Sequence, residues 1–293
     1  MQAKNEKTVL ITGATGGLGK AISGVFYKNN YNLVLVSRDL ERLDQVSENL
    51  KASNPDMETN IHLYPLNFEL ATENDYKMLF QFSMDNIIFP QAIINNAGII
   101  GEFGESWKIP IEAYQNAFSV NLYSAINMCK LFLPKMIENN YGKIVSISGG
   151  GATGAREKFS PYSLSKVALV RYMENLSKEL QSLRLNIDVN CIAPGAMKTQ
   201  MTEHILIAGE EKAGKKEIDS LKKQLKEGGI SPTKAADLCY FLASPESDGI
   251  TGRLISAVWD DWKTLPQRRS DIQNTDIYTL KRITAKDRGF NWD

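Results

Sequence analysis

The sequence contains few residues that would bind a metal ion or form disulfides. Its 293 residues include three cysteines and two histidines. Cys129, Cys191 and Cys239 lie far apart and lack CxxC spacing, so the sequence favours neither a zinc site nor a disulfide framework. We therefore expect no metal site and a reducing compartment.

The sequence also lacks long apolar runs and an excess of charge of either sign. The 34 Lys and Arg residues balance the 34 Asp and Glu residues, which gives no reason to expect a nucleic acid or an anionic membrane as a partner. No apolar run approaches the length that a bilayer requires, and the polar N-terminus MQAKNEK is not followed by a signal-peptide core. These absences favour a cytoplasmic protein with no membrane segment.

Short β-branched segments alternate with longer segments of helical periodicity along most of the chain. The segments with strand character are 8–14, 32–37, 61–66, 92–96, 143–148, 186–192 and 253–258. Strands that alternate with helices form βαβ units and a parallel sheet. The pattern therefore predicts an α/β fold with one doubly wound, seven-stranded parallel sheet and helices on both of its faces.

Two long helices are predicted near the middle of the chain. One follows Tyr162, where apolar residues recur at spacings of three and four and form a single stripe. The stripe consists of Leu169, Tyr172, Met173, Leu176, Leu180 and Leu183. The other helix is expected over residues 116–138, and Pro134 should end or kink it early.

The C-terminal part of the chain differs from the rest in its pattern of charged and apolar residues. Residues 199–229 carry mixed charges and a thin apolar stripe, which predicts a mobile helical lid. Ser231 and Pro232 then begin another helix as a cap and a first-turn proline. We assign residues 1–262 to one catalytic domain and residues 263–293 to a C-terminal extension, whose aromatic residues favour docking, for example on a neighbouring subunit, over disorder.

A glycine-rich turn follows the first predicted strand. TVLITGATGGLGKAI places Gly13, Gly17 and Gly19 between a strand and a helix. Glycine allows the chain to turn sharply and its backbone to approach a pyrophosphate, which the first N–H groups of the helix then face. The absence of GK[ST] argues against a P-loop nucleotide hydrolase. The turn therefore predicts a dinucleotide site.

Several motifs in succession resemble the short-chain dehydrogenase/reductase family. They are TGxxxGxG at 12–19, NNAG at 95–98, VNL at 120–122, YxxxK at 162–166 and PGAMKT at 194–199. They follow the order of that family and cover roughly residues 8–258. The resemblance implies a single Rossmann-type domain and an oxidoreductase that uses a nicotinamide cofactor.

The same resemblance assigns the cofactor-binding residues. The phosphates would lie against Gly13, Thr15, Gly16, Gly17, Leu18 and Gly19, the adenosine against Ser37, Arg38, Asn67, Asn95, Ala97 and Gly98, and the nicotinamide part against Tyr162, Lys166, Pro194, Gly195 and Thr199.

Ser37 and Arg38 bear on the choice between NADP(H) and NAD(H). NAD-preferring members of the family usually carry Asp where Ser37 stands, because a carboxylate binds the ribose hydroxyls and repels a 2′-phosphate. Arg38 can pair bidentately with a phosphate, although it could instead pair with Asp39 or Glu41 on the surface. We therefore expect NADP(H), with NAD(H) less favoured.

Tyr162 and Lys166 are the candidate proton-transfer pair. They lie four residues apart at the start of a helix, so their side chains share a face. A tyrosine of pKa about 10 is a poor acid or base at neutral pH, but a nearby ammonium group and an oxidised nicotinamide ring would favour the phenolate. By resemblance, Lys166 also binds the nicotinamide ribose, and Asn121 holds a water that links Lys166 to solvent.

Two adjacent positions, Ser148 and Gly149, are candidates for the place of a catalytic serine. The family's serine lies about thirteen positions before the tyrosine, which lands on Gly149, whereas Ser148 is one residue earlier. Adjacent strand residues point to opposite faces, so the difference matters. Either the glycines allow Ser148 to reach the substrate, or water, Thr153 or backbone N–H groups replace the serine. We favour Ser148.

The leading hypothesis is an enzyme that transfers hydride between NADP(H) and a small carbonyl/alcohol substrate. One alternative is nucleotide-sugar epimerase or dehydratase chemistry, but those relatives usually have TGxxGxxG and a larger C-terminal domain. A second alternative is a non-catalytic NADP(H)-binding sensor, which the uncertain serine supports. Family members commonly pair through the helices after Asn116 and Tyr162, so the resemblance implies a homodimer or homotetramer.

Overall fold

The structure, a computed structural model, describes residues 7–86, 88–226 and 229–292 and is built around a parallel sheet. Its strands are β1 (Thr8–Thr12), β2 (Asn32–Ser37), β3 (Ile61–Pro65), β4 (Ala92–Asn95), β5 (Gly142–Ile147), β6 (Ile187–Ala193) and β7 (Leu254–Ser256). The seven strands pair in the order β3-β2-β1-β4-β5-β6-β7, and every pairing is parallel. The order reverses between β1 and β4, and in such sheets ligands bind at the carboxyl ends of the strands beside this point.

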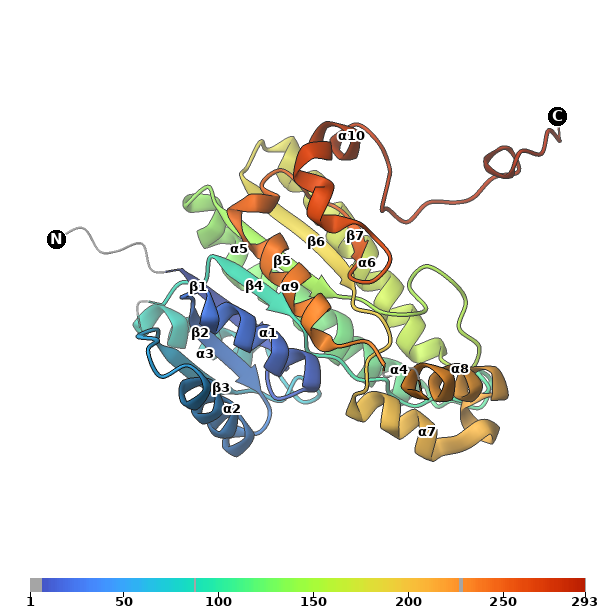
Figure 1. The fold of residues 1–293 in the computed structure, drawn as a ribbon, viewed down its shortest axis with the longest axis horizontal. Coiled ribbons are helices and arrows are strands. Elements are labelled where there is room, and N and C mark those ends of the chain that lie inside the picture. The colour runs from blue at the N-terminus through green and yellow to red at the C-terminus, as the bar shows by residue number, and fades with distance from the viewer. Residues whose placement is uncertain (1–6, 87, 227–228, 293) are drawn as a thin grey trace.

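Helices cover both faces of the sheet, as Figure 1 shows. One face carries α1 (Gly17–Lys28), α2 (Leu40–Ser53) and α9 (Pro232–Ala243), and the other carries α3 (Glu73–Asp85), α4 (Ile111–Phe118), α5 (Ser124–Glu138) and α6 (Ser160–Ser182). Along β1, Val9 and Ile11 pack on the first set of helices, whereas Leu10 packs on the second. Burial on both faces explains the continuous apolar strands. The predicted fold class is confirmed.

The helix expected over residues 116–138 begins earlier, at Ile111, and contains a π turn, and its proline does not end it. α4 ends at Phe118, a π-helical turn covers Ser119–Tyr123, and α5 continues through Pro134 to Glu138. The predicted early end at Pro134 was therefore wrong, and the alternative of a kink at Pro134 stays a prediction. Pro134 and Lys130, whose carbonyl loses its partner, both lie on the exposed side, where water can hydrate that carbonyl.

The apolar stripe of α6 packs on the sheet along most of its length. Leu169, Met173, Leu176 and Leu180 are buried, and Tyr172 is partly buried against the same cluster. Leu183 departs from the prediction, because it follows the last helical residue and its side chain is 67% exposed.

Two helices stand beyond the carboxyl ends of the strands, in the segment expected to form a lid. α7 (Gln200–Ala213) and α8 (Lys215–Lys226) contact each other, and they lie at the lower right of Figure 1. Ile205, Ile218 and Leu221 pack on Phe103 and Phe159 of the main body. The expected helices are present, and the mobility of this lid stays a prediction.

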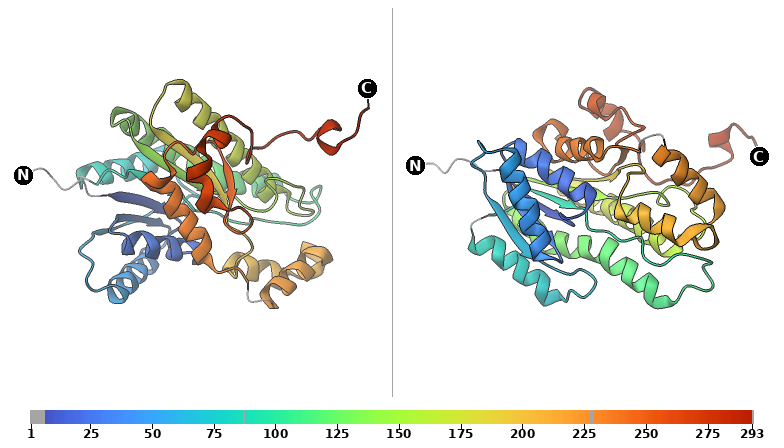
Figure 2. Two further views of the ribbon diagram at one scale, coloured as in Figure 1. Left: turned by 45° about the horizontal axis from the view of Figure 1, so that its top comes forward. Right: turned by 60° about the horizontal axis from the view of Figure 1, so that its bottom comes forward.

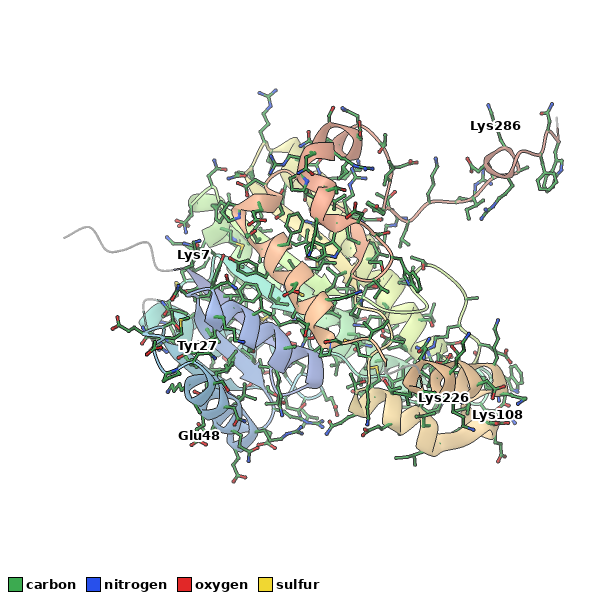
Figure 3. All side chains as sticks on the ribbon, viewed as in Figure 1. Lys7, Tyr27, Glu48, Lys108, Lys226 and Lys286 are labelled. Atoms are coloured by element: carbon green, nitrogen blue, oxygen red, sulfur yellow. The ribbon has the colours of Figure 1, made fainter. Side chains whose placement is uncertain are left out.

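The C-terminal extension first packs on the body and then leaves it. A 3₁₀ segment (Trp262–Arg268) and α10 (Arg269–Gln273) bury Leu265 and Ile272. Both views in Figure 2 show that the last part of the chain stands clear, and Figure 3 labels Lys286 on this arm. None of the helices within the described ranges is long and apolar enough to cross a membrane.

Candidate active site

A cavity of about 670 Å³ opens at the carboxyl ends of the strands, where the strand order reverses. Its walls include nearly all of the residues expected to bind a cofactor. These are Gly13, Thr15, Gly16, Gly17, Leu18, Gly19, Ser37, Arg38, Asn67, Ala97, Gly98, Tyr162, Lys166, Pro194, Gly195 and Thr199. Ser148 also lines the cavity, whereas Asn95 and Asn121 lie behind its wall.

The glycine-rich turn has no room for side chains at two of its positions. Gly13 has φ +65°, and a Cβ on it would lie 2.9 Å from the Ala97 Cα atom. A Cβ on Gly19 would lie 2.2 Å from the Gly13 carbonyl oxygen. These contacts explain why the turn requires glycine there and how the N-terminus of α1 comes to face the cavity.

The Thr12 hydroxyl fastens the chain after β4 to the end of β1. It accepts hydrogen bonds from the backbone N–H groups of Asn96 and Ala97, each at 3.0 Å. The Asn96 side-chain amide donates to the carbonyl oxygens of Thr12 and Gly13 at 2.9 and 3.1 Å. Asn96 therefore braces the glycine-rich turn, a role that sequence analysis did not assign to it.

Asn95, which was expected beside the adenosine, is instead inside the sheet. Its Nδ2 donates to the Ser146 Oγ atom at 3.2 Å, and the residue is buried and absent from the cavity wall. Neighbouring positions of a strand end point to opposite sides. This alternation explains why Asn96, and not Asn95, reaches the cavity.

Arg38 and Arg42 both line the adenosine end of the cavity. Arg38 Nη1 lies 3.3 Å from Glu69 Oε1, and its side chain is largely exposed, so this ion pair is worth at most about 1 kcal/mol. Asp39 is engaged elsewhere, because its side chain caps α2 by accepting the Arg42 N–H. No motif indicated Arg42, which lies in the first turn of α2, whereas Arg38 precedes that helix.

Tyr162 and Lys166 lie on the first turns of α6, and both are buried. The Lys166 ammonium donates to the Ile147 carbonyl at 2.8 Å and lies 5.8 Å from the centre of the Tyr162 ring. Burial lowers the pKa of Lys166 to about 8. Burial also raises the pKa of Tyr162, and Arg156 is the neighbour that opposes this rise. The expected effect of Lys166 together with an oxidised nicotinamide ring on this pKa stays a prediction.

Asn121 belongs to the π-helical turn and is held by the backbone of Ile99. Its Oδ1 accepts the Ile99 N–H at 2.8 Å, and its Nδ2 donates to the Ile99 carbonyl and to Ser165 Oγ, both at 2.9 Å. A Cβ on Gly98 would lie 3.3 Å from Asn121 Oδ1 and 3.4 Å from Lys166 Nζ. Asn121 and Lys166 thus converge on the back of Gly98, although only Lys166 lines the cavity.

Ser148 and Gly149 take different positions around Tyr162. Ser148 is buried in the cavity wall, and its Oγ has no hydrogen-bond partner within the described part of the chain. A Cβ on Gly149 would lie 2.2 Å from the Tyr162 hydroxyl oxygen. Position 149 therefore faces the tyrosine hydroxyl directly, and the tyrosine fills the space that a side chain there would need.

The lid side of the cavity contains charged residues that sequence analysis missed. Arg156, from the loop between β5 and α6, forms an ion pair with Glu217 of α8, with Nη2 and Oε1 2.5 Å apart. The only signal in the sequence was the position of Arg156 six residues before Tyr162. Trp259 stands at the rim and is 85% exposed. Within the described residues, no cluster of three His, Cys, Asp or Glu could hold a metal ion.

Comparison with known proteins gives matches along most of the chain. A family model for short chain dehydrogenase matches residues 7–208. Carbonyl reductase family member 4 of Xenopus tropicalis is 31% identical over 252 residues, which cover 85% of this chain and 95% of that protein. The uncharacterized oxidoreductase YvaG of Bacillus subtilis is 27% identical over 263 residues, 86% of this chain and 94% of the relative.

Among solved structures, this fold is similar to that of YwfH, an NADPH dependent reductase involved in bacilysin biosynthesis. The TM-score is 0.75 at 26% sequence identity, and the match covers 86% of this chain and 97% of the other.

We expect Gly19→Ala to abolish the affinity of the cavity for a nicotinamide dinucleotide. The new Cβ would collide with the Gly13 carbonyl oxygen, and the backbone of the turn would have to open. Isothermal titration calorimetry with NADPH and with NADH measures the loss. Gly24→Ala in the same helix is the matched control, because its Cβ would meet only Leu50 Cδ2 at 3.9 Å. Equal affinities in the two variants would contradict this account of the turn.

Proposed function

Because the chain belongs to the short chain dehydrogenase family, we propose that it is an NADP(H)-dependent oxidoreductase that acts on a carbonyl/alcohol substrate, a CH–OH group in the reduced form. The observation that carries the proposal is that Tyr162 and Lys166 share one cavity with the glycine-rich turn at the strand-order reversal. A proton-transfer group and a dinucleotide cradle in one cavity are what hydride transfer to a carbonyl requires.

The residues of the cavity fit a nicotinamide dinucleotide. Gly13 and Gly19 leave the backbone of the turn bare where a pyrophosphate would approach, and the N-terminus of α1 follows directly. Pro194, Gly195 and Thr199 lie on the cavity wall for the carboxamide. When bound, the nicotinamide ring supplies or accepts the hydride.

Tyr162 acts as the general acid and base. In reduction its hydroxyl donates a proton to the carbonyl oxygen, and in oxidation it removes a proton from the alcohol. A tyrosine whose pKa burial keeps high is protonated at neutral pH, which suits the donor role. Lys166 binds the nicotinamide ribose, and Asn121 behind Gly98 connects Lys166 to solvent through a water.

Ser148 is the favoured second donor to the substrate oxygen. Its buried Oγ lines the cavity and lacks a partner within the described residues, and a buried hydroxyl without a partner is costly. Gly149 stands where the family's serine is expected, so Ser148 would approach the substrate oxygen from a neighbouring position. Water, Thr153 and backbone N–H groups remain the alternative donors.

NADP(H) is the proposed cofactor, because Ser37 leaves the end of β2 without the carboxylate that would repel a 2′-phosphate. Arg38 and Arg42 stand beside Ser37 on the cavity wall, and the pair of Arg38 with Glu69 is weak. The similar structure that is described as an NADPH dependent reductase supports the same choice. The family also leads us to propose a small-molecule substrate, a homodimer or homotetramer, and a cytoplasmic location.

Tyr162→Phe tests the proposed activity against the sensor alternative. We expect the variant to lose turnover of a carbonyl panel with NADPH by about 10²- to 10⁴-fold, the usual contribution of a general acid, and to keep its affinity for NADPH. Initial rates and calorimetry measure the two quantities. Tight NADPH binding by the wild-type protein, with no turnover on any member of the panel, would favour the sensor.

Ser148→Ala and Gly149→Ala each test one of the two positions near the tyrosine hydroxyl. Loss of a hydrogen-bond donor to the transition state costs on the order of 3 kcal/mol, so Ser148→Ala should lower kcat about 100-fold. Gly149→Ala should also lower kcat about 100-fold, because the Cβ displaces Tyr162 from its position. Gly150→Ala is the matched control, since its Cβ would meet no atom within 4 Å. Full activity of Ser148→Ala would assign the donor role to another group.

Arg38→Ala tests the cofactor choice. Loss of hydrogen bonds to a charged group costs about 1.5–3 kcal/mol, so the KM for NADPH should rise about ten- to a hundredfold while the KM for NADH stays nearly constant. Glu69→Gln is the control, because it removes the carboxylate that pairs with Arg38 and should not raise the KM for NADPH. An equal rise in both KM values for Arg38→Ala would contradict recognition of the 2′-phosphate.

A further inference from the structure

Arg156 is a second cation beside Tyr162, and it lies outside every motif of the sequence. Its guanidinium carbon is 5.7 Å from the centre of the Tyr162 ring and 4.1 Å from that of Phe159. Lys166 is at a similar distance from the tyrosine ring, but its ammonium group is buried and donates to the Ile147 carbonyl. Arg156 lines the cavity, so its charge reaches the tyrosine from the open side.

The partner of Arg156 comes from the lid. Nη2 and Nε of Arg156 donate to the two carboxylate oxygens of Glu217 at 2.5 and 3.3 Å. The two side chains are 20% and 21% exposed, so water screens this fork less than it screens an ordinary surface pair. Glu217 also lines the cavity. The positive field of Arg156 at Tyr162 is therefore partly offset by a carboxylate that α8 carries.

The charged groups described so far around Tyr162 come from three elements. Lys166 lies on the same helix, Arg156 on the preceding loop and Glu217 on α8. His204 and Lys212 of α7 face Phe103, which stacks on Phe159. Burial raises the pKa of Tyr162 and Arg156 lowers it. Gly149 has no side-chain hydroxyl that could form a hydrogen bond with the Tyr162 hydroxyl. The charge of Arg156 is therefore well placed to influence the protonation of Tyr162.

We propose that Arg156 is a positioning residue for Tyr162, which holds the tyrosine ring and favours its phenolate, and that Glu217 moderates this effect from the lid. The proposal rests on the proposed role of Tyr162 as general acid and base. It gives the lid an electrostatic connection to the proton-transfer residue. It also predicts that neutralising the two members of one ion pair has opposite effects on the tyrosine.

The first test is the pH dependence of kcat/KM for alcohol oxidation, which needs the phenolate. Arg156→Gln should move the rise of activity to higher pH by about one unit, the size expected for one charge at about 6 Å in a partly screened site. Glu217→Gln should move it to lower pH, because Arg156 then acts without its counter-charge. Arg156→Lys keeps the positive charge and should retain most of the wild-type profile.

A second measurement does not depend on turnover. In protein labelled with ¹³C at tyrosine Cζ, the resonance that Tyr162→Phe removes is assigned to Tyr162, and its chemical shift is followed with pH in each variant. The ionisation of Tyr162 should start at higher pH in Arg156→Gln and at lower pH in Glu217→Gln. Circular dichroism of each variant verifies the fold at every pH used.

The opposite pH shifts expected for Arg156→Gln and Glu217→Gln distinguish this proposal from an ion pair that only holds α8 in place. If the ion pair only held α8 in place, Arg156→Gln and Glu217→Gln would both raise the KM for substrate and leave the pH profile and the resonance unmoved, and the proposal would be overturned. If Tyr162→Phe retained the full activity of the wild type, the assignment of Tyr162 as acid and base would fail instead. The resonance would then still report whether Arg156 and Glu217 act on the tyrosine.

Discussion

The Thr12 hydroxyl joins the two strand ends between which the cavity opens. It accepts hydrogen bonds from the backbone N–H groups of Asn96 and Ala97, which lie 84 and 85 residues further along the chain. Because these bonds hold the chain after β4 against the end of β1, Ala97 lies so close to Gly13 that a Cβ would not fit. Gly98 follows directly, and a Cβ on it would lie within 3.4 Å of both the Asn121 and the Lys166 side chains. The same backbone segment therefore contacts the glycine-rich turn and the residues around Lys166.

Burial shifts the pKa values of Tyr162 and Lys166, which lie on the cavity wall. Tyr162 and Lys166 are both removed from water, which works against the charged form of each. The two cations near Tyr162 are held differently. Lys166 is bonded to a backbone carbonyl, whereas Arg156 is paired with a carboxylate of another helix. A fixed dipole keeps one orientation, whereas a side-chain ion pair depends on where its two elements lie. The site thus combines one cation held by a backbone carbonyl with another held by a side chain of α8.

Local sequence patterns were enough to predict the sheet, because β-branched runs buried on both faces leave a clear signal. Most of the residues that the motifs assigned to the cofactor also line the cavity. Asn95 and Asn96 differ by one position, and the structure was needed to show that Asn96 lines the cavity. Ser148 and Gly149 both line it, and the structure was needed to show that position 149 faces the Tyr162 hydroxyl. Leu183 left its stripe because the helix ended one residue earlier. The ion pair of Arg156 and Glu217 joins positions 61 residues apart, and no local pattern encodes such a contact.

The π-helical turn at Ser119–Tyr123 has a consequence for how this region tolerates changes in length. A π turn holds one more residue than an α turn, so it behaves as a single-residue insertion accommodated within a continuous helix. Because the wide turn absorbs the extra residue, α4 and α5 keep their rotational phase, and deleting one residue there would restore regular α-helix without turning either apolar side from the sheet. The residues of the turn itself, including Asn121, would change direction, so the contact of Asn121 with Ile99 depends on the extra residue. In this segment, the number of residues matters as much as their identity.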